Sequence, residues 1–194
     1  MKTMIFTLAL CLGAVAAATD SQHGERSETL GKLDIQEVVK ADEPLVVLER
    51  KHTRQYKFRC QMATNKGGSV ETGYNYTLRA RYTNGTDAPY VEGTVKIMLE
   101  PLGVRGAPYK ATYKDRNGIH FTLTLEAMGK NGTCFVILTN KTDGNTGCEL
   151  LVPVSRKDDD VPEVCDKHYS EKCDGPTQRL YEPYCIYPSE ESPL

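Results

Sequence analysis

The sequence predicts an all-β fold: an eight-stranded antiparallel up-and-down barrel, with a short helix before it. Eight segments between residues 45 and 154 are rich in β-branched and aromatic residues, and most are joined by turn-forming residues. Apolar and polar residues alternate in several of them. Six cysteines after residue 18 are enough for three disulfides. The same pattern leaves a β-sandwich as the alternative.

The first 18 residues have the pattern of a signal peptide. Lys2 precedes the apolar run of residues 4–15, and alanines occupy positions 16–18. Cleavage there removes Lys2 and Cys11, so the formal net charge changes from −2 to −3 and six of the seven cysteines remain. We therefore expect a secreted, extracellular chain with one domain over residues 19–194, without a membrane span. The mildly acidic charge argues against nucleic acid as a partner.

A short helix is predicted over residues 27–41, before the barrel. Ser27 can cap its N-terminus, and apolar residues recur at helical spacing from Leu30 to Val39. Pro44 is expected to end the helical segment, because proline cannot continue a helix.

After Pro44 the sequence has the pattern of β-strands. The eight predicted strands are residues 45–50, 56–62, 69–83, 90–99, 108–114, 118–127, 133–139 and 148–154. The predicted turns contain Asn, Asp, Gly or Pro and lie at residues 65–68, 84–85, 101–103, 115–118, 129–132 and 143–145. Residues 45–154 thus form the predicted barrel, and residues 155–194 follow it.

Alternation predicts which side chains face the inside of the barrel. The inward set predicted in this way is Tyr74, Tyr76, Leu78, Tyr82, Val95, Ile97, Tyr109, Tyr113, Phe121 and Leu123. Such residues also fill the solid core of many β-proteins. Several inward tyrosines favour a cavity that holds a ligand with a polar end, because a buried hydroxyl needs a hydrogen-bond partner.

Four glycosylation sequons support an exported protein. They begin at Asn75, Asn84, Asn131 and Asn140. Asn75 falls on the predicted outward face of its strand, which is the face that a glycan can occupy.

The sequence does not contain the common signatures of catalysis. It has no Gly-x-Ser-x-Gly elbow, no His-Glu-x-x-His motif and no phosphate-binding glycine loop. The four histidines are scattered along the chain, and disulfides explain the cysteines of an exported protein better than a metal does. We expect a binding protein and not an enzyme, with no cofactor and no metal site.

The most specific feature is the arrangement of the later cysteines. Cys134 begins an apolar run, Gly147-Cys148-Glu149-Leu150-Leu151 lies in the last predicted strand, and three further cysteines follow up to Cys185. This arrangement resembles that of the tick salivary lipocalins, the family of the histamine-binding proteins, and the likeness extends from residue 27 to Cys185. The resemblance implies a lipocalin barrel that binds a small ligand, followed by a C-terminal helix and a disulfide-tied tail over residues 155–194.

The resemblance also implies the disulfide pairs Cys60–Cys185, Cys134–Cys165 and Cys148–Cys173. If Cys134 faces outward to reach the final helix, Phe135 and Ile137 face the lumen. Glu149 and Leu151 share one face of the last predicted strand and complete the candidate ligand-binding set. A solvent-facing position at the rim is an equal alternative for Glu149.

The chain departs from the amine-binding members of this family. They use tryptophan and carboxylates to hold a cation, whereas this chain has no tryptophan, and Leu151 stands where their Gly-Cys-Glu-Leu motif continues with Trp. A hydrophobic ligand is therefore expected. Because Arg79, Arg81 and Lys96 fall on predicted outward faces, a neutral sterol is favoured over an acidic lipid, although Arg50 lies near the expected mouth.

Among lipid-binding members, the chain is most similar to the japanin-like, sterol-binding immunomodulators. The expected function is binding of a sterol such as cholesterol, or of another lipid, with an effect on host immune or inflammatory responses. Two alternatives stay open: a scavenger of histamine, serotonin or leukotrienes, and a protein that acts through its surface on a host receptor, a host protease or an immune-cell protein.

Overall fold

The computed structural model describes residues 33–52, 57–82, 88–103 and 106–187. The predicted signal peptide, residues 27–32 of the predicted first helix and the sequon at Asn84 lie outside these residues.

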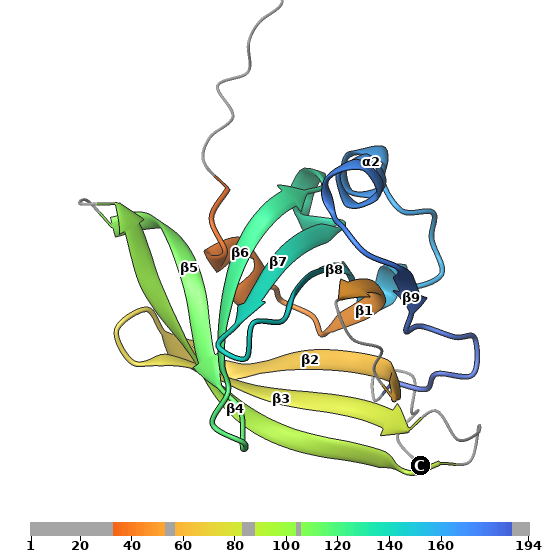
Figure 1. The fold of residues 1–194 in the computed structure, drawn as a ribbon, viewed down its shortest axis with the longest axis horizontal. Coiled ribbons are helices and arrows are strands. Elements are labelled where there is room, and N and C mark those ends of the chain that lie inside the picture. The colour runs from red at the N-terminus through yellow and green to blue at the C-terminus, as the bar shows by residue number, and fades with distance from the viewer. Residues whose placement is uncertain (1–32, 53–56, 83–87, 104–105, 188–194) are drawn as a thin grey trace, which may run out of the picture. The chain divides into compact units, whose positions relative to one another are not determined.

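Eight consecutive strands form a closed antiparallel barrel (Figure 1). They are β1 (Leu45–His52), β2 (Phe58–Ser69), β3 (Gly73–Tyr82), β4 (Tyr90–Gly103), β5 (Gly106–Lys114), β6 (His120–Met128), β7 (Phe135–Lys141) and β8 (Thr146–Pro153). Each strand from β2 to β8 pairs with the next along the chain, and β1 pairs with both β8 and β2. This is the predicted up-and-down barrel, so the fold prediction is confirmed and the β-sandwich is excluded.

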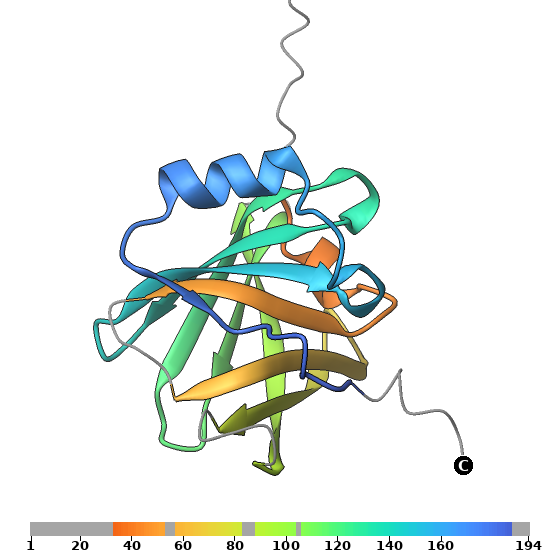
Figure 2. The same ribbon diagram turned by 90° about the vertical axis from the view of Figure 1, so that its right-hand side faces the viewer.

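The barrel closes over a short stretch of β1. Leu45 and Val46 pair with β2, whereas residues 49–51 pair with a short strand of the C-terminal tail, β9 (Thr177–Arg179). Figure 2 shows the tail passing along β1 toward β2. The tail thus occupies the edge of β1 that β2 leaves unpaired, which satisfies backbone groups that would otherwise be an exposed strand edge. Residues 177–179 were not predicted to form a strand.

Within residues 33–41, which the structure describes, the helical part of the predicted N-terminal helix is shorter than expected. Within the described part of residues 27–41, only α1 (Gln36–Val39) is α-helical. Asp34 explains its start, because the Asp34 carboxylate accepts a hydrogen bond from the backbone N–H of Gln36 at 3.0 Å. Ile35, the residue before α1, is attached to the barrel, since its N–H donates to the carbonyl of Tyr109 in β5.

Two predicted turns are strand residues instead. Residues 65–68 lie within β2, where a bulge and the left-handed Gly67 (φ 99°) let the strand continue to Ser69. Residues 101–103 lie within β4, where Pro101 pairs with Tyr109 of β5. The strands of these two hairpins are therefore longer than the turn-forming residues indicated. Residues 129–132, by contrast, form a turn that includes η1 (Lys130–Gly132), a 3₁₀-helix.

One apolar cluster lies inside the barrel, and a second packs against the outer face of the barrel wall. The inner cluster consists of apolar residues of the α1 segment and of inward strand residues such as Val47, Ile97 and Leu151. The outer cluster lies under the tail and α2 (Glu163–Lys172), includes outward residues such as Val46 and Val152, and contains all six cysteines of the described chain. Most of β1 is buried because it has one cluster on each face.

Disulfides connect the outer elements to the barrel at three points. The pairs are Cys60–Cys185, Cys134–Cys165 and Cys148–Cys173, which are the pairs that the family resemblance implies. They attach the tail to β2 and α2 to the chain before β7 and to β8. Lys51 adds a fourth connection, because its ammonium group donates to the carbonyls of Tyr169 and Cys173 at the end of α2, each at 3.0 Å.

Candidate ligand-binding site

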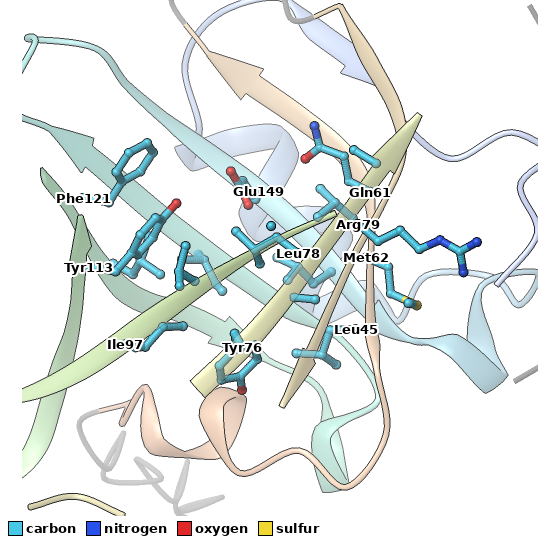
Figure 3. Close-up of a pocket in the computed structure, with 18 of the residues that line it drawn as sticks. Leu45, Gln61, Met62, Tyr76, Leu78, Arg79, Ile97, Tyr113, Phe121 and Glu149 are labelled. Atoms are coloured by element: carbon cyan, nitrogen blue, oxygen red, sulfur yellow. The ribbon is translucent and has the colours of Figure 1, made fainter. Parts of the chain in front are cut away.

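A cavity of about 470 Å³ lies inside the barrel. All eight barrel strands and the α1 segment contribute to its lining, and Figure 3 shows residues from several strands converging on it. Its apolar lining includes Ile35, Val38, Val39, Leu45, Val47, Ala63, Leu78, Val95, Ile97, Leu123, Ile137 and Leu151. The volume falls within the range of about 300–1,000 Å³ that is typical of small-molecule sites.

The α1 segment closes one end of this cavity. The carbonyl of Val39 accepts hydrogen bonds from the Tyr76 hydroxyl at 3.0 Å and from the Asn65 side-chain amide at 2.8 Å. Figure 3 shows the Tyr76 ring beside the α1 ribbon, across the cavity from Glu149. Burial raises the pKa of the Tyr76 hydroxyl, so this group remains protonated and keeps donating.

A cluster of polar side chains faces the cavity where β8, β1 and β2 adjoin. Arg50 of β1 lies opposite Glu149 of β8, and its Nη2 donates to Glu149 Oε1 at 2.6 Å. The same Nη2 also donates to Gln61 Oε1 of β2 at 2.9 Å. His52 stands next to this ion pair, with its Nε2 3.6 Å from Glu149 Oε1. One positive and one negative charge are thus held together in a largely apolar lumen.

The pKa values of two groups in this cluster favour a paired carboxylate beside a neutral imidazole. Burial alone would raise the pKa of Glu149, but the charge of Arg50 and the hydrogen bond that Arg50 donates outweigh it, so the pKa is lowered. Burial, followed by the charge of Arg50, lowers the pKa of His52 to about 4. At neutral pH the ion pair of Arg50 and Glu149 therefore lies beside an uncharged His52.

Gly147 makes room for His52. A Cβ atom at position 147 would clash with the His52 ring and with the carbonyl oxygen of Lys51. The glycine that precedes Cys148 and Glu149 thus allows β1 to approach β8 closely at the polar cluster.

Three other charged lining residues, Arg79, Glu92 and Asp115, have partners at the cavity's edge. Arg79 lies 3.6 Å from Glu92, and its guanidinium stacks 4.0 Å above the Tyr90 ring. In Figure 3 this guanidinium points away from Glu149. Asp115 accepts hydrogen bonds from two backbone N–H groups of its own turn, those of Asn117 and Ile119. Each of the three lining carboxylates, Glu92, Asp115 and Glu149, therefore has a partner.

Aromatic residues and cations occur together on another part of the lining. Tyr113 and Phe121 stack with ring centroids 4.4 Å apart, and the ammonium of Lys141 lies 5.0 Å from the Phe121 centroid. Arg116, in the adjacent turn, also lines the cavity. The stacked rings of Tyr113 and Phe121 and the apolar residues near α1 line the same cavity.

Ten of the fourteen predicted site residues lie on the lining. They are Tyr76, Leu78, Val95, Ile97, Tyr113, Phe121, Leu123, Ile137, Glu149 and Leu151. Tyr74 and Phe135 are buried in the inner cluster without lining the cavity, and Tyr109 packs against that cluster. Tyr82 does not fit the prediction: at the end of β3 it is 45% exposed, and its ring packs against Phe58.

Several lining residues were not predicted. Arg50 lies on the lumen side of β1, and Arg79 contributes to the lining although its strand position was expected to face outward. Gln61 follows Cys60, which turns outward to its disulfide at a bulge in β2. Alternation from an outward Cys60 would have placed Gln61 inside. The contribution of α1 had no such signal, because it depends on tertiary contacts of a four-residue helix.

Within the residues that the structure describes, no three His, Cys, Asp or Glu side chains gather as metal ligands. None of the helices there is both long and apolar enough to cross a bilayer.

Comparison with known proteins agrees with this geometry. A family model described as "tick histamine binding protein" matches residues 25–187. Japanin from Rhipicephalus appendiculatus bound to cholesterol has a similar fold, with a TM-score of 0.55 and 12% identity over 75% of this chain and 96% of japanin. So does the AM182 serotonin complex, with a TM-score of 0.53 and 16% identity over 80% of this chain and 94% of that one. No curated protein sequence matches the chain. The chain belongs to the tick histamine-binding protein family.

Proposed function

We propose that this protein is a secreted lipocalin that binds a small, mainly apolar and uncharged ligand, such as a sterol or another neutral lipid, in its barrel. The observation that carries the proposal is the lumen itself: an apolar cavity of about 470 Å³ in which the buried carboxylate of Glu149 is already paired with Arg50. Apolar surface provides most of the free energy for binding such a ligand.

The partners of the carboxylates are the reason to prefer a neutral ligand over a biogenic amine. A buried ammonium group needs a carboxylate whose charge is not already compensated. Glu149 pairs with Arg50, Glu92 lies beside Arg79, and Asp115 is held by backbone N–H groups. A histamine or serotonin cation would have to share one of these carboxylates with the group that already pairs with it or hydrogen-bonds it.

The similar structures are consistent with this reading and also define the alternative. Japanin was solved with cholesterol, which is a neutral sterol, whereas AM182 was solved with serotonin, which is an amine. One barrel fold thus accommodates both ligand classes, and the residues of the lumen have to decide between them. Binding, and not catalysis, is the activity that we propose.

Secretion and an effect on the host complete the proposal. The apolar leader of residues 4–15 and the three disulfides support export to an oxidising compartment. Asn75, Asn131 and Asn140 are exposed, so a glycan can occupy each of them. We propose that the exported protein removes or presents its ligand in the host and thereby modulates immune or inflammatory responses.

Identification of the bound molecule tests this function. Protein secreted from eukaryotic cells would be extracted with organic solvent, and the extract analysed by mass spectrometry. We expect about one neutral lipid per protein, and negligible binding when the extracted protein is titrated with histamine, serotonin or leukotriene. An empty barrel that binds histamine tightly would contradict the proposal.

A further inference from the structure

We propose that Arg50, Gln61 and Glu149 form a specific binding site for one uncharged hydroxyl group of the ligand. This inference rests on the proposed function, because it assigns the polar end of a ligand whose apolar body fills the same lumen. It goes further by stating which head group is selected and which side chains select it.

Hydrogen bonds from Arg50 hold the side chains of Gln61 and Glu149 in defined positions. A single guanidinium nitrogen, Nη2 of Arg50, holds Glu149 Oε1 at 2.6 Å and Gln61 Oε1 at 2.9 Å. The three residues come from three adjoining strands and all line the cavity. Their side chains are thus fixed by one another before a ligand enters, which reduces the entropy cost of binding.

Each of the two residues held by Arg50 keeps one unused polar atom. Because Oε1 of Gln61 accepts from Arg50, its Nε2 is the donor that remains, and no acceptor for it is found among the described residues. Likewise, Glu149 Oε2 has no hydrogen-bond donor in the described chain. The cluster therefore offers one acceptor and one donor, and a hydroxyl group supplies the matching donor and acceptor.

The charge of the cluster favours a neutral head group over a charged one. Arg50 and Glu149 compensate each other in a site where Arg50 is 7% exposed. A carboxylate head would compete with Glu149 for Arg50, and an ammonium head would compete with Arg50 for Glu149. Either competition leaves one buried charge poorly compensated, whereas a hydroxyl leaves the ion pair intact.

Two further titratable groups, His52 and Lys141, lie near this ion pair. His52 is uncharged at neutral pH, because burial and the charge of Arg50 lower its pKa to about 4. The ammonium of Lys141, the other cation that acts on Glu149, lies 5.0 Å from the Phe121 centroid.

A series of ligands with one apolar chain and different heads tests the inference. The full-length secreted protein, after extraction of bound lipid, would be loaded with the fluorescent apolar probe N-phenyl-1-naphthylamine. Dodecanol, dodecanoate and dodecylammonium would then compete for the lumen at pH 7.4. We expect dodecanol to bind at least about tenfold more tightly than either charged ligand, because only the charged heads disturb the buried pair.

A substitution by a side chain of similar shape tests whether Gln61 hydrogen-bonds the ligand's hydroxyl group. Gln61→Met removes the amide donor together with the Oε1 that accepts from Arg50, so we expect dodecanol binding to weaken by about 2- to 12-fold relative to binding of the probe. Gln178→Met makes the same chemical change on β9, outside the cavity lining, and is expected to leave dodecanol binding as it was.

The outcomes separate this inference from the proposed function. If the protein binds neither the probe nor any of the three ligands, the proposed function itself fails. If the probe binds and the three heads compete equally, or if Gln61→Met keeps the full preference for dodecanol, the hydroxyl site is refuted while the apolar-ligand function survives.

Discussion

The ion pair between Arg50 and Glu149 joins directly opposite residues of β1 and β8 inside a mainly apolar lumen. Its two side chains are only 9% and 18% exposed, so each charge depends on the other for compensation. Removing one partner of such a pair usually costs far more stability than replacing both with apolar residues, because a single buried charge then remains.

A double-mutant comparison tests this dependence. We expect Arg50→Met to lower the free energy of unfolding by about 3–5 kcal/mol, because Glu149 loses the charge that compensates it. Adding Glu149→Leu should restore most of that loss, since no unpaired carboxylate remains. Urea denaturation of the two variants and the wild type measures both effects. Equal stability of Arg50→Met and the wild type would show that the pair is not buried.

The neighbouring His52 gives stability a defined pH dependence. Its pKa is about 4 in the folded protein, compared with an ordinary value near 6.5. Between these values the unfolded chain binds a proton that the folded chain does not, so stability decreases as the pH falls from 6.5 to 4. The expected loss from this one residue reaches about 3 kcal/mol.

Replacement of the imidazole checks this assignment. His52→Phe should remove most of the decrease between pH 6.5 and 4 when unfolding is followed by urea denaturation at a series of pH values. The exposed His120 provides the control, because His120→Phe is expected to leave the pH profile unchanged. An unaltered profile for His52→Phe would mean that another group causes the acid sensitivity.

At the scale of elements, α1 is the part of the site that depends most on long-range contacts. It has only four residues, too few to be stable alone, and Tyr76 and Asn65 hold its last carbonyl. The helical pattern of residues 27–41 could not predict these contacts. It does not indicate where residues of β3 and β5 hydrogen-bond to this segment.

The Tyr76 hydroxyl can be removed without changing the size of the ring by much. We expect Tyr76→Phe to reduce stability by about 1 kcal/mol and to speed amide hydrogen exchange at Val38 and Val39, because α1 loses one of its attachments. Tyr184→Phe, at a residue that is 37% exposed, is the matched control. Unchanged exchange in α1 would show that Tyr76 does not secure the closed end.

The strands differ from α1 in how far they were predictable. Alternation located most of the inward residues of β3, β4 and β6, because one face of each strand packs on the lumen and the other does not. It failed at the ends and bulges of strands: Tyr82 lies beyond the packed region, and turn-forming residues 65–68 remained within β2. A bulge adds a residue to one strand only, and local composition does not reveal it.

At the scale of the whole molecule, the tail and α2 form a second layer outside the barrel. The family resemblance predicted its disulfides, whereas the three residues of β9 carry no strand pattern of their own and were missed. Leu180 and Tyr181 both donate to the carbonyl of Leu48, so the tail is joined to β1 as well as to Cys60. The second layer therefore supports the strands that carry Arg50 and Gln61.

Removal of single disulfides compares the long and short connections. Cys60 and Cys185 are separated by 125 residues, and Cys134 and Cys165 by 31. Chain entropy predicts losses of about 5 and about 4 kcal/mol for the respective double alanine variants. We further expect faster hydrogen exchange at Leu180 and Tyr181 only without Cys60–Cys185. Equal protection of these amides in both variants would show that the tail does not need its disulfide.

The central claim is that the lumen itself binds a neutral, mainly apolar molecule, and cholesterol titration of a lumen-filled variant tests it most directly. Ala63 lines the cavity on β2, whereas Thr94 is exposed on β4. Cholesterol should bind the lipid-extracted wild type and Thr94→Phe at one molecule per chain, and Ala63→Phe should bind at least about tenfold more weakly because its ring occupies the cavity. Equal cholesterol binding by all three proteins, or none by the wild type, would contradict the claim.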